Sequence, residues 1–329
     1  MTNHIVVTSH GQQARRFALL FALTVTGFVI GVDLLVLWVG EGTFASVDNL
    51  KFLLFLVAFI GACGVFQLHR LTGSGARVAK LLGGSLVVLE PVDAAWRQFR
   101  NVASETAIAA AIPMPKLFVI EGDEAINAFA AGTADKGTAV AVSAGALKKL
   151  SRAELQGVVA HEMAHLRHQD VALSRLLASG LFGLLCFTLL GKVLLAGAAA
   201  SGSTRTKEGG FGAFLLGAVG LGMLVTGVLG WLAAAVLDAA TSREMEFRAD
   251  ADAARMLSDS SGLVGALVKL GQESKEFPPE ASGWLRASNP MFFNVAAKRY
   301  WFDTHPPLLE RIRALDPSKA AELQTMMGG

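Results

Sequence analysis

Two histidines and a glutamate are spaced in a way that suits a metal-dependent hydrolase. His161 and His165 are four positions apart, so on a helix they lie one turn apart on the same face. Both imidazoles can then bind one ion at about 2.0–2.1 Å, and this pair of ligands favours zinc. Glu162 is offset from that face but can lie beside a metal-bound water and accept its proton. The motif therefore predicts a zinc site in which Glu162 is the general base.

The residues around this motif predict the helix that it requires. Ser151 is followed three positions later by Glu154, which is the pattern of a capping box at a helix start. An isolated pair of histidines occurs by chance on many surface helices, but the intervening Glu162 and the capped apolar helix favour a metal site. His168 shares the helix face and lies too far along it to join the same ion. We interpret His168 as a solvated histidine at the helix end.

The composition predicts an integral membrane protein. Of the 329 residues, 53% are hydrophobic and 17% are charged, and the mean hydropathy is +0.48. These values are too apolar for an ordinary soluble domain. The formal net charge is only +2, and no run is rich in lysine or arginine, so nucleic acid is not an expected partner. Cys63 and Cys186 lie in apolar runs without metal-ligand spacing and are expected as core or lipid-facing residues.

Four apolar runs are long enough to cross a bilayer, and they form two hairpins. Residues 17–40 and 50–68 make the first hairpin, and residues 176–200 and 211–237 make the second. We expect the metal helix to run on towards the first span of the second hairpin.

Between the two hairpins the composition becomes that of a soluble domain. The amphipathic segment 93–111 predicts a helix that ends at the break 112–115, which contains two prolines. Three short β-like runs predict a small sheet before the metal helix. These runs are 116–120, 125–130 and 138–143. The stretch 126–132 can form an exposed edge strand that pairs with an extended peptide, and an ordinary core strand is the alternative.

A catalytic zinc needs a third protein ligand and an open position for water. The acidic residues that follow the second hairpin are Glu244, Glu246, Asp250 and Asp252. Here the chain resembles the HtpX-type membrane metallopeptidases, which are relatives of the type I CAAX prenyl proteases. Four motifs in order carry the resemblance: Asn127-Ala128-Phe129, His161-Glu162-Met163-Ala164-His165, Ser242-Arg243-x-x-Glu246-Phe247-x-Ala249-Asp250 and Thr304-His305-Pro306-Pro307. The resemblance covers the chain from about residue 70, and the N-terminal hairpin matches in hydropathy only.

The resemblance implies further site residues. Glu246 would be the third zinc ligand, and Asp250, one helical turn later, would hold a ligand histidine in its metal-binding tautomer. The implied residues on the substrate side are Asn127, Ala128 and Phe129 on the substrate-binding strand, and His305 and Arg311 at the oxyanion of the tetrahedral intermediate.

Together these observations predict an α+β membrane protein. We expect a mainly helical, gluzincin-like metalloprotease domain with a small β-sheet, and four transmembrane helices in two hairpins. His165 and Glu246 must lie on one side of the membrane to share an ion, and two spans between them satisfy this condition. The expected division is an N-terminal transmembrane hairpin at 1–70, the first half of the protease domain at 71–170, an inserted transmembrane hairpin at 171–238 and the second half of the protease domain at 239–329.

The expected activity is hydrolysis of peptide bonds with one Zn²⁺ per chain. By resemblance, the substrates would be misfolded or damaged membrane proteins, cleaved during the stress response as protein quality control. The basic residues Arg15 and Arg16 before the first span favour both termini and the protease domain on the cytoplasmic side of a bacterial inner membrane. The oligomeric state is left open.

Two other functions compete with this prediction. The first is an intramembrane zinc protease, which the charged residues that flank the motif disfavour. The second is a membrane chaperone or scaffold with a structural zinc, although a structural zinc normally has four protein ligands.

Overall fold

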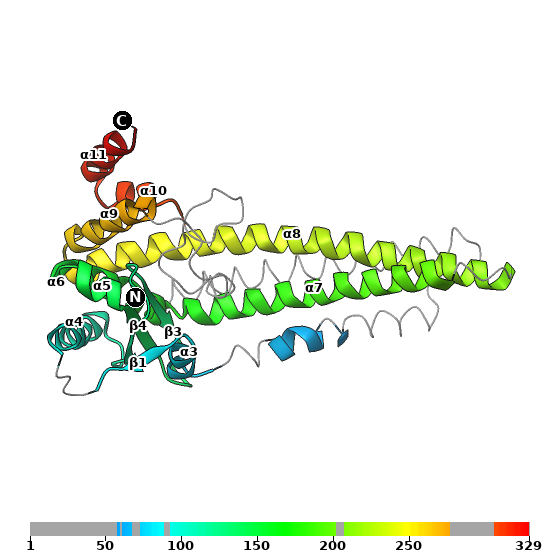
Figure 1. The fold of residues 1–329 in the computed structure, drawn as a ribbon, viewed down its shortest axis with the longest axis horizontal. Helices are drawn as coiled ribbons and strands as arrows, with labels where there is room; N and C mark the ends of the chain where they lie inside the picture. Colours follow the sequence, from blue (N-terminus) through cyan, green and yellow to red (C-terminus); the bar gives the residue numbers. More distant parts are fainter. Residues whose placement is uncertain are drawn as a thin grey trace. The chain divides into compact units, whose positions relative to one another are not determined.

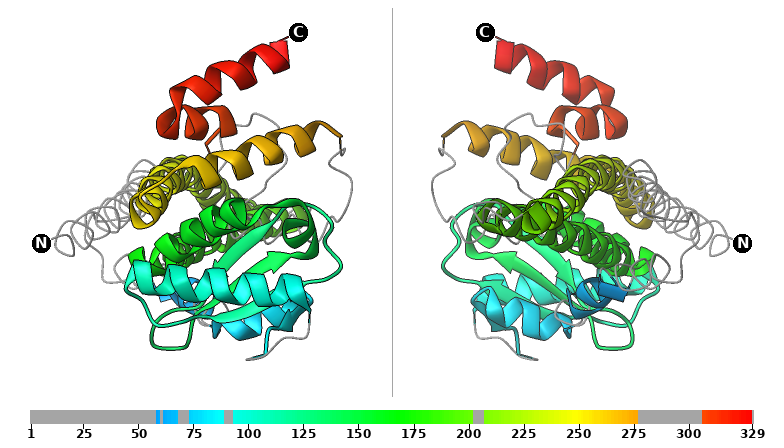
Figure 2. Two further views of the ribbon diagram at one scale, coloured as in Figure 1. Left: turned by 90° about the vertical axis from the view of Figure 1, so that its left-hand side faces the viewer. Right: turned by 90° about the vertical axis from the view of Figure 1, so that its right-hand side faces the viewer.

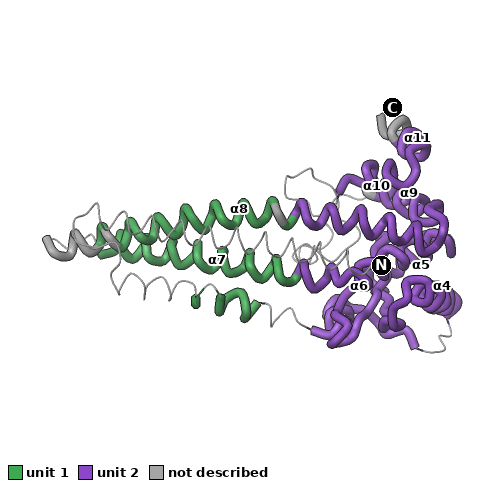
Figure 3. Tube along the Cα trace, turned by 180° about the vertical axis from the view of Figure 1, so that it is seen from behind, with its two compact units in different colours: residues 1–71, 175–238 green, residues 72–174, 239–329 purple. Residues whose placement is uncertain are grey.

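The structure is a computed structural model, and it describes residues 58–59, 61–67, 73–88, 93–201, 207–276 and 306–328 (Figure 1). The chain divides into two compact units, and each is described by itself. One unit combines residues 1–71 and 175–238, and the other combines residues 72–174 and 239–329 (Figure 3). His305, the apolar run 17–40 and most of the run 50–68 lie outside the described residues.

The second of these units contains a four-stranded mixed sheet, as the β-like runs predict. Its strands are β1 (Gly84–Leu86), β2 (Lys116–Ile120), β3 (Ala128–Ala131) and β4 (Ala139–Ser143). They lie in the order β1-β2-β4-β3. Strands β2 and β4 are parallel, and the other two pairs are antiparallel. Within the part of the chain that the structure describes, β3 pairs with β4 alone, so β3 is an edge strand.

Strand β3 begins later than its sequence predicts, at Ala128 instead of residue 125. The Ser143 hydroxyl donates to the carbonyl of Ala125 at 2.5 Å and accepts from the amide of Asn127 at 3.0 Å. The side chain of Asp123 also accepts from the amide of Ala125 at 3.0 Å. Side chains therefore take the backbone groups that a longer strand would pair, because aspartate and serine favour such turns.

Helices cover both faces of the sheet (Figure 2). Helix α3 (Gly75–Leu81) packs on one face, where Ala79 joins Phe118 and Phe129 in an apolar cluster. The other face packs against α4 (Ala94–Ala110) and α6 (Arg152–His168). The remaining helices of this unit are α5 (Ala144–Lys149), α9 (Ser261–Glu276), α10 (Leu308–Leu315) and α11 (Pro317–Gly328).

Helix α6 is fixed at both ends. The predicted capping box is confirmed, because the Ser151 hydroxyl accepts from the amide of Glu154 and the Glu154 carboxylate accepts from the amide of Ser151. The helix ends at His168, and Gln169 follows in the left-handed region with φ 59°. The next helix begins at Asp170. The chain therefore runs on towards the first span of the second hairpin, as predicted, but in a separate helix after the single residue Gln169.

Two long apolar helices follow. Helix α7 (Asp170–Ser201) and helix α8 (Lys207–Leu257) contain the predicted second hairpin, and each is long and apolar enough to cross a membrane. Their backbones pack closely, since a Cβ atom on Gly191 would lie 2.7 Å from the amide nitrogen of Leu224 and 2.8 Å from the carbonyl of Gly220. Small residues at such contacts are typical of packed membrane helices. Helix α8 continues as one helix of 51 residues into the polar segment that carries Glu246.

Candidate metal centre

Three side chains from two helices converge within the second unit. The Nε2 atoms of His161 and His165, both on α6, are 3.1 Å apart. The Glu246 carboxylate on α8 lies 3.5 Å from the first of these atoms and 3.4 Å from the second. One ligand atom of each residue lies within 4.8 Å of the others, so the set can hold a metal ion.

A carboxylate holds the far side of each imidazole. The Nδ1 atom of His161 lies 2.8 Å from Oδ1 of Asp250, and that of His165 lies 2.8 Å from Oδ2 of Asp170. A neutral histidine that donates its Nδ1–H to a carboxylate presents the lone pair of its Nε2. Both Nε2 lone pairs therefore face each other and the Glu246 carboxylate.

This donor set fits zinc. Three groups that only accept are brought together in a buried place, which is unfavourable unless a cation lies between them. Two zinc–ligand bonds of about 2.0–2.1 Å at a tetrahedral angle place the ligand atoms about 3.3 Å apart. The two Nε2 atoms are 3.1 Å apart, which is close to that value. The two oxygens of Glu246 lie at a similar distance, Oε1 at 3.4 Å from His165 and Oε2 at 3.5 Å from His161. Three protein ligands leave the fourth position of a tetrahedral ion open, as in catalytic zinc sites.

The surroundings of the two histidines also favour positive charge, as their pKa values show. Burial lowers the pKa of His165, but its hydrogen bonds to Asp170 and Glu246 outweigh burial and raise that pKa well above its usual value. Burial and the nearby Arg311 lower the pKa of His161. Its hydrogen bonds to Asp250 and Glu246 have the larger combined effect, so the pKa is raised above its usual value. Without a metal ion, the cluster therefore attracts protons.

Arg311 is fully buried beside the ligands. Its Nε and Nη2 atoms donate to the two oxygens of Asp250 at 2.8 and 2.7 Å, and its Nη1 atom lies 2.8 Å from Oε2 of Glu246. Burial alone raises the pKa of Asp250, but Arg311 outweighs it and keeps that pKa below the usual range. Arg311 thus fixes one metal-facing carboxylate and the carboxylate that orients His161.

Glu162, the predicted general base, is 4% exposed and lies next to His161 on α6. It is close enough to Arg311 to contribute to the raised pKa of that guanidinium. The structure therefore places an ionisable carboxylate beside the metal cluster in a buried setting, where the ionic interactions of a group are stronger than in water.

Sequence reasoning missed the acidic partner of His165. Asp170 is the first residue of α7, and its second oxygen pairs with Arg248 of α8. The available signal was an acidic residue five positions after the second histidine, at the start of an apolar helix. From the sequence alone, Asp170 is one of the charged residues that flank the motif.

The interpretation of His168 as a solvated residue is wrong. His168 is 5% exposed, and its Nε2 atom lies 2.5 Å from Oδ2 of Asp252. Asp252 also pairs with Arg255. The partner of His168 comes from α8, 84 positions later in the sequence, so this contact links the end of the metal helix to the helix that carries Glu246.

Of the predicted residues on the substrate side, Asn127 lies just before β3, and Ala128 and Phe129 lie within it. The side chains of Ala128 and Phe129 are buried. Asn127 is half-buried just before the strand, and its amide group donates to Asp123 at 3.3 Å. A further residue that the sequence did not suggest is Glu273 of α9, which accepts from the amide of Ile126 at 2.9 Å.

A metal-dependent hydrolase needs a buried cluster that attracts a cation and a carboxylate beside it. The fold and the site therefore define this class of protein. The chain belongs to peptidase family M48, whose sequence model matches residues 94–319. It is therefore a metalloprotease, and its two long apolar helices give it the character of a membrane protein.

Similar proteins carry the name Protease HtpX homolog. The one from Thermoanaerobacter pseudethanolicus is 36% identical over 219 residues, which are 65% of this chain and 70% of that protein. The one from Dictyoglomus turgidum is 35% identical over 233 residues, 69% of this chain and 71% of that protein. Among solved structures, S. mikatae Ste24p is 19% identical with a TM-score of 0.44, and the match covers 94% of this chain and 66% of that one.

Proposed function

We propose that this protein is a zinc-dependent endopeptidase of the membrane that cleaves misfolded or damaged membrane proteins at the cytoplasmic surface. The observation that carries this proposal is the convergence of His161, His165 and Glu246, with separations that suit zinc. Peptidases of this family are zinc-dependent in general, which supports zinc over other metals for this chain.

Each residue of the site has a proposed task. His161, His165 and Glu246 would hold one Zn²⁺. Zinc supplies a lowered water pKa and polarisation of the substrate carbonyl when it is bound. Glu162 accepts the proton of the attacking water and returns it to the leaving amine, because it is the carboxylate of the motif that is not one of the three proposed ligands.

Other residues would orient the ligands. Asp250 and Asp170 keep His161 and His165 in the tautomer that presents Nε2. The contacts of Arg311 support a role in holding Asp250 and Glu246, which leaves the oxyanion to His305 in our proposal.

The substrate would bind as an extended peptide along β3, next to Asn127, Ala128 and Phe129. An edge strand can add a peptide strand through main-chain hydrogen bonds, and among the described strands β3 pairs with β4 alone. We further propose the four-span arrangement, with the protease halves at 71–170 and 239–329 and the hairpins at 1–70 and 171–238. A cytoplasmic protease domain in a bacterial inner membrane and a role in the stress response complete the proposal.

A comparison of zinc content with cleavage tests this function. Detergent-purified wild-type protein should bind about one zinc and digest casein. Glu162→Gln should keep its zinc and lose about 100-fold or more of the cleavage rate, because the general base is removed. Glu121→Gln, a change in an exposed glutamate, should match the wild type in both measurements. A Glu162→Gln protein that cleaves at the wild-type rate would contradict the proposal and favour a scaffold with a structural zinc.

A further inference from the structure

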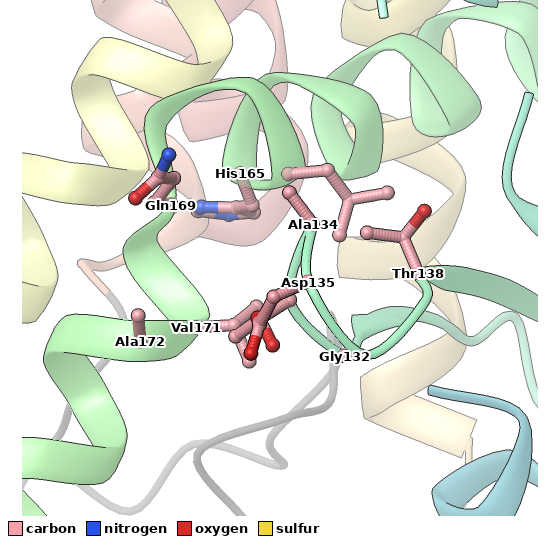
Figure 4. A pocket seen from close by; sticks show the side chains of 10 residues that line it. Gly132, Ala134, Asp135, Thr138, His165, Gln169, Val171 and Ala172 are labelled. Carbon is pink, nitrogen blue, oxygen red and sulfur yellow. The ribbon is translucent and has the colours of Figure 1, made fainter. Parts of the chain in front are cut away.

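A pocket of about 310 Å³ lies beside the metal cluster, and the proposed mechanism does not use it. One wall is the loop between β3 and β4, and the other wall is the corner where α6 passes into α7 (Figure 4). The lining residues are Gly132, Thr133, Ala134, Asp135, Thr138, His165, Leu166, Gln169, Val171 and Ala172. His165 belongs to both the pocket and the metal cluster, so the pocket opens next to the place where a substrate carbonyl would react.

The position of the pocket matches a side chain of a bound peptide. Gly132, in the pocket wall, directly follows Ala131, the last residue of β3. A peptide that pairs with β3 advances about 3.3 Å per residue. A peptide whose scissile carbonyl lies by His165 therefore has a neighbouring residue, close to the scissile bond, at the pocket.

The wall formed by the loop is conformationally defined. Gly132 has φ 90°, and a Cβ atom on it would lie 2.2 Å from the carbonyl oxygen of Gly137. A residue with a side chain is strongly disfavoured there, since positive φ and the short contact both oppose it. This conformation of the loop therefore requires glycine at position 132.

The lining determines which side chain fits. Ala134, Leu166, Val171 and Ala172 provide apolar surface, and the one basic residue among the ten, His165, is already engaged by Asp170 and is a proposed zinc ligand. Asp135 is the one carboxylate among them, and a hydrogen bond from the Thr133 side chain keeps its pKa below the usual value. The volume of about 310 Å³ lies within the range of about 300–1,000 Å³ for small-ligand pockets, so the pocket has room for a large apolar side chain.

We propose that this pocket is a specificity subsite that accepts an uncharged, apolar side chain of about the size of leucine next to the scissile bond and disfavours acidic side chains. The inference rests on the proposed peptidase function and adds a substrate preference to it. It involves residues that contact substrate side chains, and it leaves the proton transfer by Glu162 unchanged.

The test is a map of cleavage sites in unfolded casein, digested by the zinc-loaded full-length protein in detergent and read by mass spectrometry. For the wild type, one position next to the scissile bond should be enriched about tenfold in leucine, methionine and similar residues over alanine, since a few methylene groups in an apolar pocket discriminate to this extent. Aspartate and glutamate should be depleted at the same position.

Two variants change the pocket in different ways. Ala172→Phe fills it, so the preference for large apolar residues at that position should fall about tenfold while cleavage beside glycine and alanine continues. Asp135→Lys reverses its charge, so acidic residues should become about threefold more frequent there. Asp135 is exposed in a loop, so Asp135→Lys should fold. This variant therefore tests the subsite even if Ala172→Phe does not fold. Ala109→Phe, on the exposed face of α4, is the matched control and should keep the wild-type map.

The results separate the subsite from the proposed function. A wild-type map without a preference at any position next to the scissile bond, or identical maps for the wild type and Asp135→Lys, would overturn the subsite while cleavage itself upholds the peptidase function. Wild-type protein that binds zinc and cleaves nothing would overturn the peptidase function and the subsite together.

Discussion

At the scale of single residues, the two histidines of the candidate metal site are held by carboxylates from two different helices. Asp250 orients His161 and comes from α8, while Asp170 orients His165 and comes from the start of α7. The motif alone predicts neither contact, since it specifies which atoms face the metal and not what lies behind them. These partners decide how strongly the imidazoles bind.

Asp170 should therefore affect metal affinity. Asp170→Asn keeps the size of the side chain but removes the charge that supports the Nδ1–H of His165, and zinc affinity should fall about 10- to 100-fold. Competition with a chromogenic chelator measures this change. Glu121→Gln alters an exposed carboxylate in the turn after β2 and should leave the affinity as it is. Equal affinities for Asp170→Asn and the wild type would show that this carboxylate does not orient His165.

Arg311 should affect stability more than any exposed arginine. Arg311→Met removes a fully buried guanidinium and leaves Asp250 and Glu246 without its charge. Loss of one partner from a buried ion pair costs about 3–5 kcal/mol, so the unfolding temperature of the zinc-free protein should fall clearly. Arg313→Met, two positions later and exposed, provides the comparison in the same thermal measurement. Arg311 is unimportant for folding if the two variants unfold together.

At the scale of elements, the metal helix depends on a close contact with α9. A Cβ atom on Gly157 of α6 would lie 2.4 Å from the backbone nitrogen of Leu263. Alanine favours a helix over glycine by about 1 kcal/mol, but a contact with backbone atoms cannot be relieved by rotating a side chain. The steric cost of this contact should therefore exceed the gain in helix propensity.

Gly157→Ala is therefore expected to destabilise the protein. Forcing extra volume into a packed contact costs about 1–3 kcal/mol, and the displaced α6 carries both histidines, so zinc affinity should fall with the unfolding temperature. Gly122→Ala adds the same methyl group where nothing lies within 4 Å, and it should change neither quantity. An unfolding temperature for Gly157→Ala at or above the wild-type value would mean that helix propensity outweighs the contact.

The sequence predicts those elements whose signals are local. The capping residues Ser151 and Glu154, the strand 116–120 and the apolar helices of the second hairpin follow from patterns within a few residues of each other, and the structure has them. His168 was misjudged because Asp252, its partner, is 84 positions away. Local patterns contain no information about such pairs, and the same holds for the contact between Asp170 and Arg248.

At the scale of the whole molecule, a metal ion would link segments that are far apart in the chain. His161 and Glu246 are separated by 85 positions, since 246 − 161 = 85. Any ligand that binds the folded state and not the unfolded one adds stability, by about 2.7 kcal/mol at a free concentration of 100 times Kd. Zinc should stabilise the protein in this way.

The stabilisation of the folded protein by zinc should depend on pH, and the pKa of His165 determines whether it rises or falls with pH. The folded-state pKa of His165 lies well above its unfolded value of 6.5. In the metal-free protein, protonated His165 therefore contributes stability that is full below pH 6.5 and is lost as pH rises through the folded-state pKa. Zinc binds the neutral imidazole, so protons compete with it at low pH.

We expect the rise in unfolding temperature on adding zinc to EDTA-treated protein to be larger at pH 8.5 than at pH 6. Differential scanning measurements at both pH values test this, with magnesium as the control ion because it prefers oxygen ligands. A larger effect of zinc at pH 6 would contradict the assignment of His165 as a ligand.

The separation of the metal-binding segments also has a consequence during biosynthesis. Arg311 is made 150 residues after His161, and the apolar stretch of α8 is translated between His165 and Glu246. A nascent chain therefore displays both histidines while the third ligand and its arginine are still unmade. In the proposed site, the metal cluster cannot be completed before Glu246 and Arg311 have left the ribosome, so the nascent chain cannot digest itself or its neighbours until then.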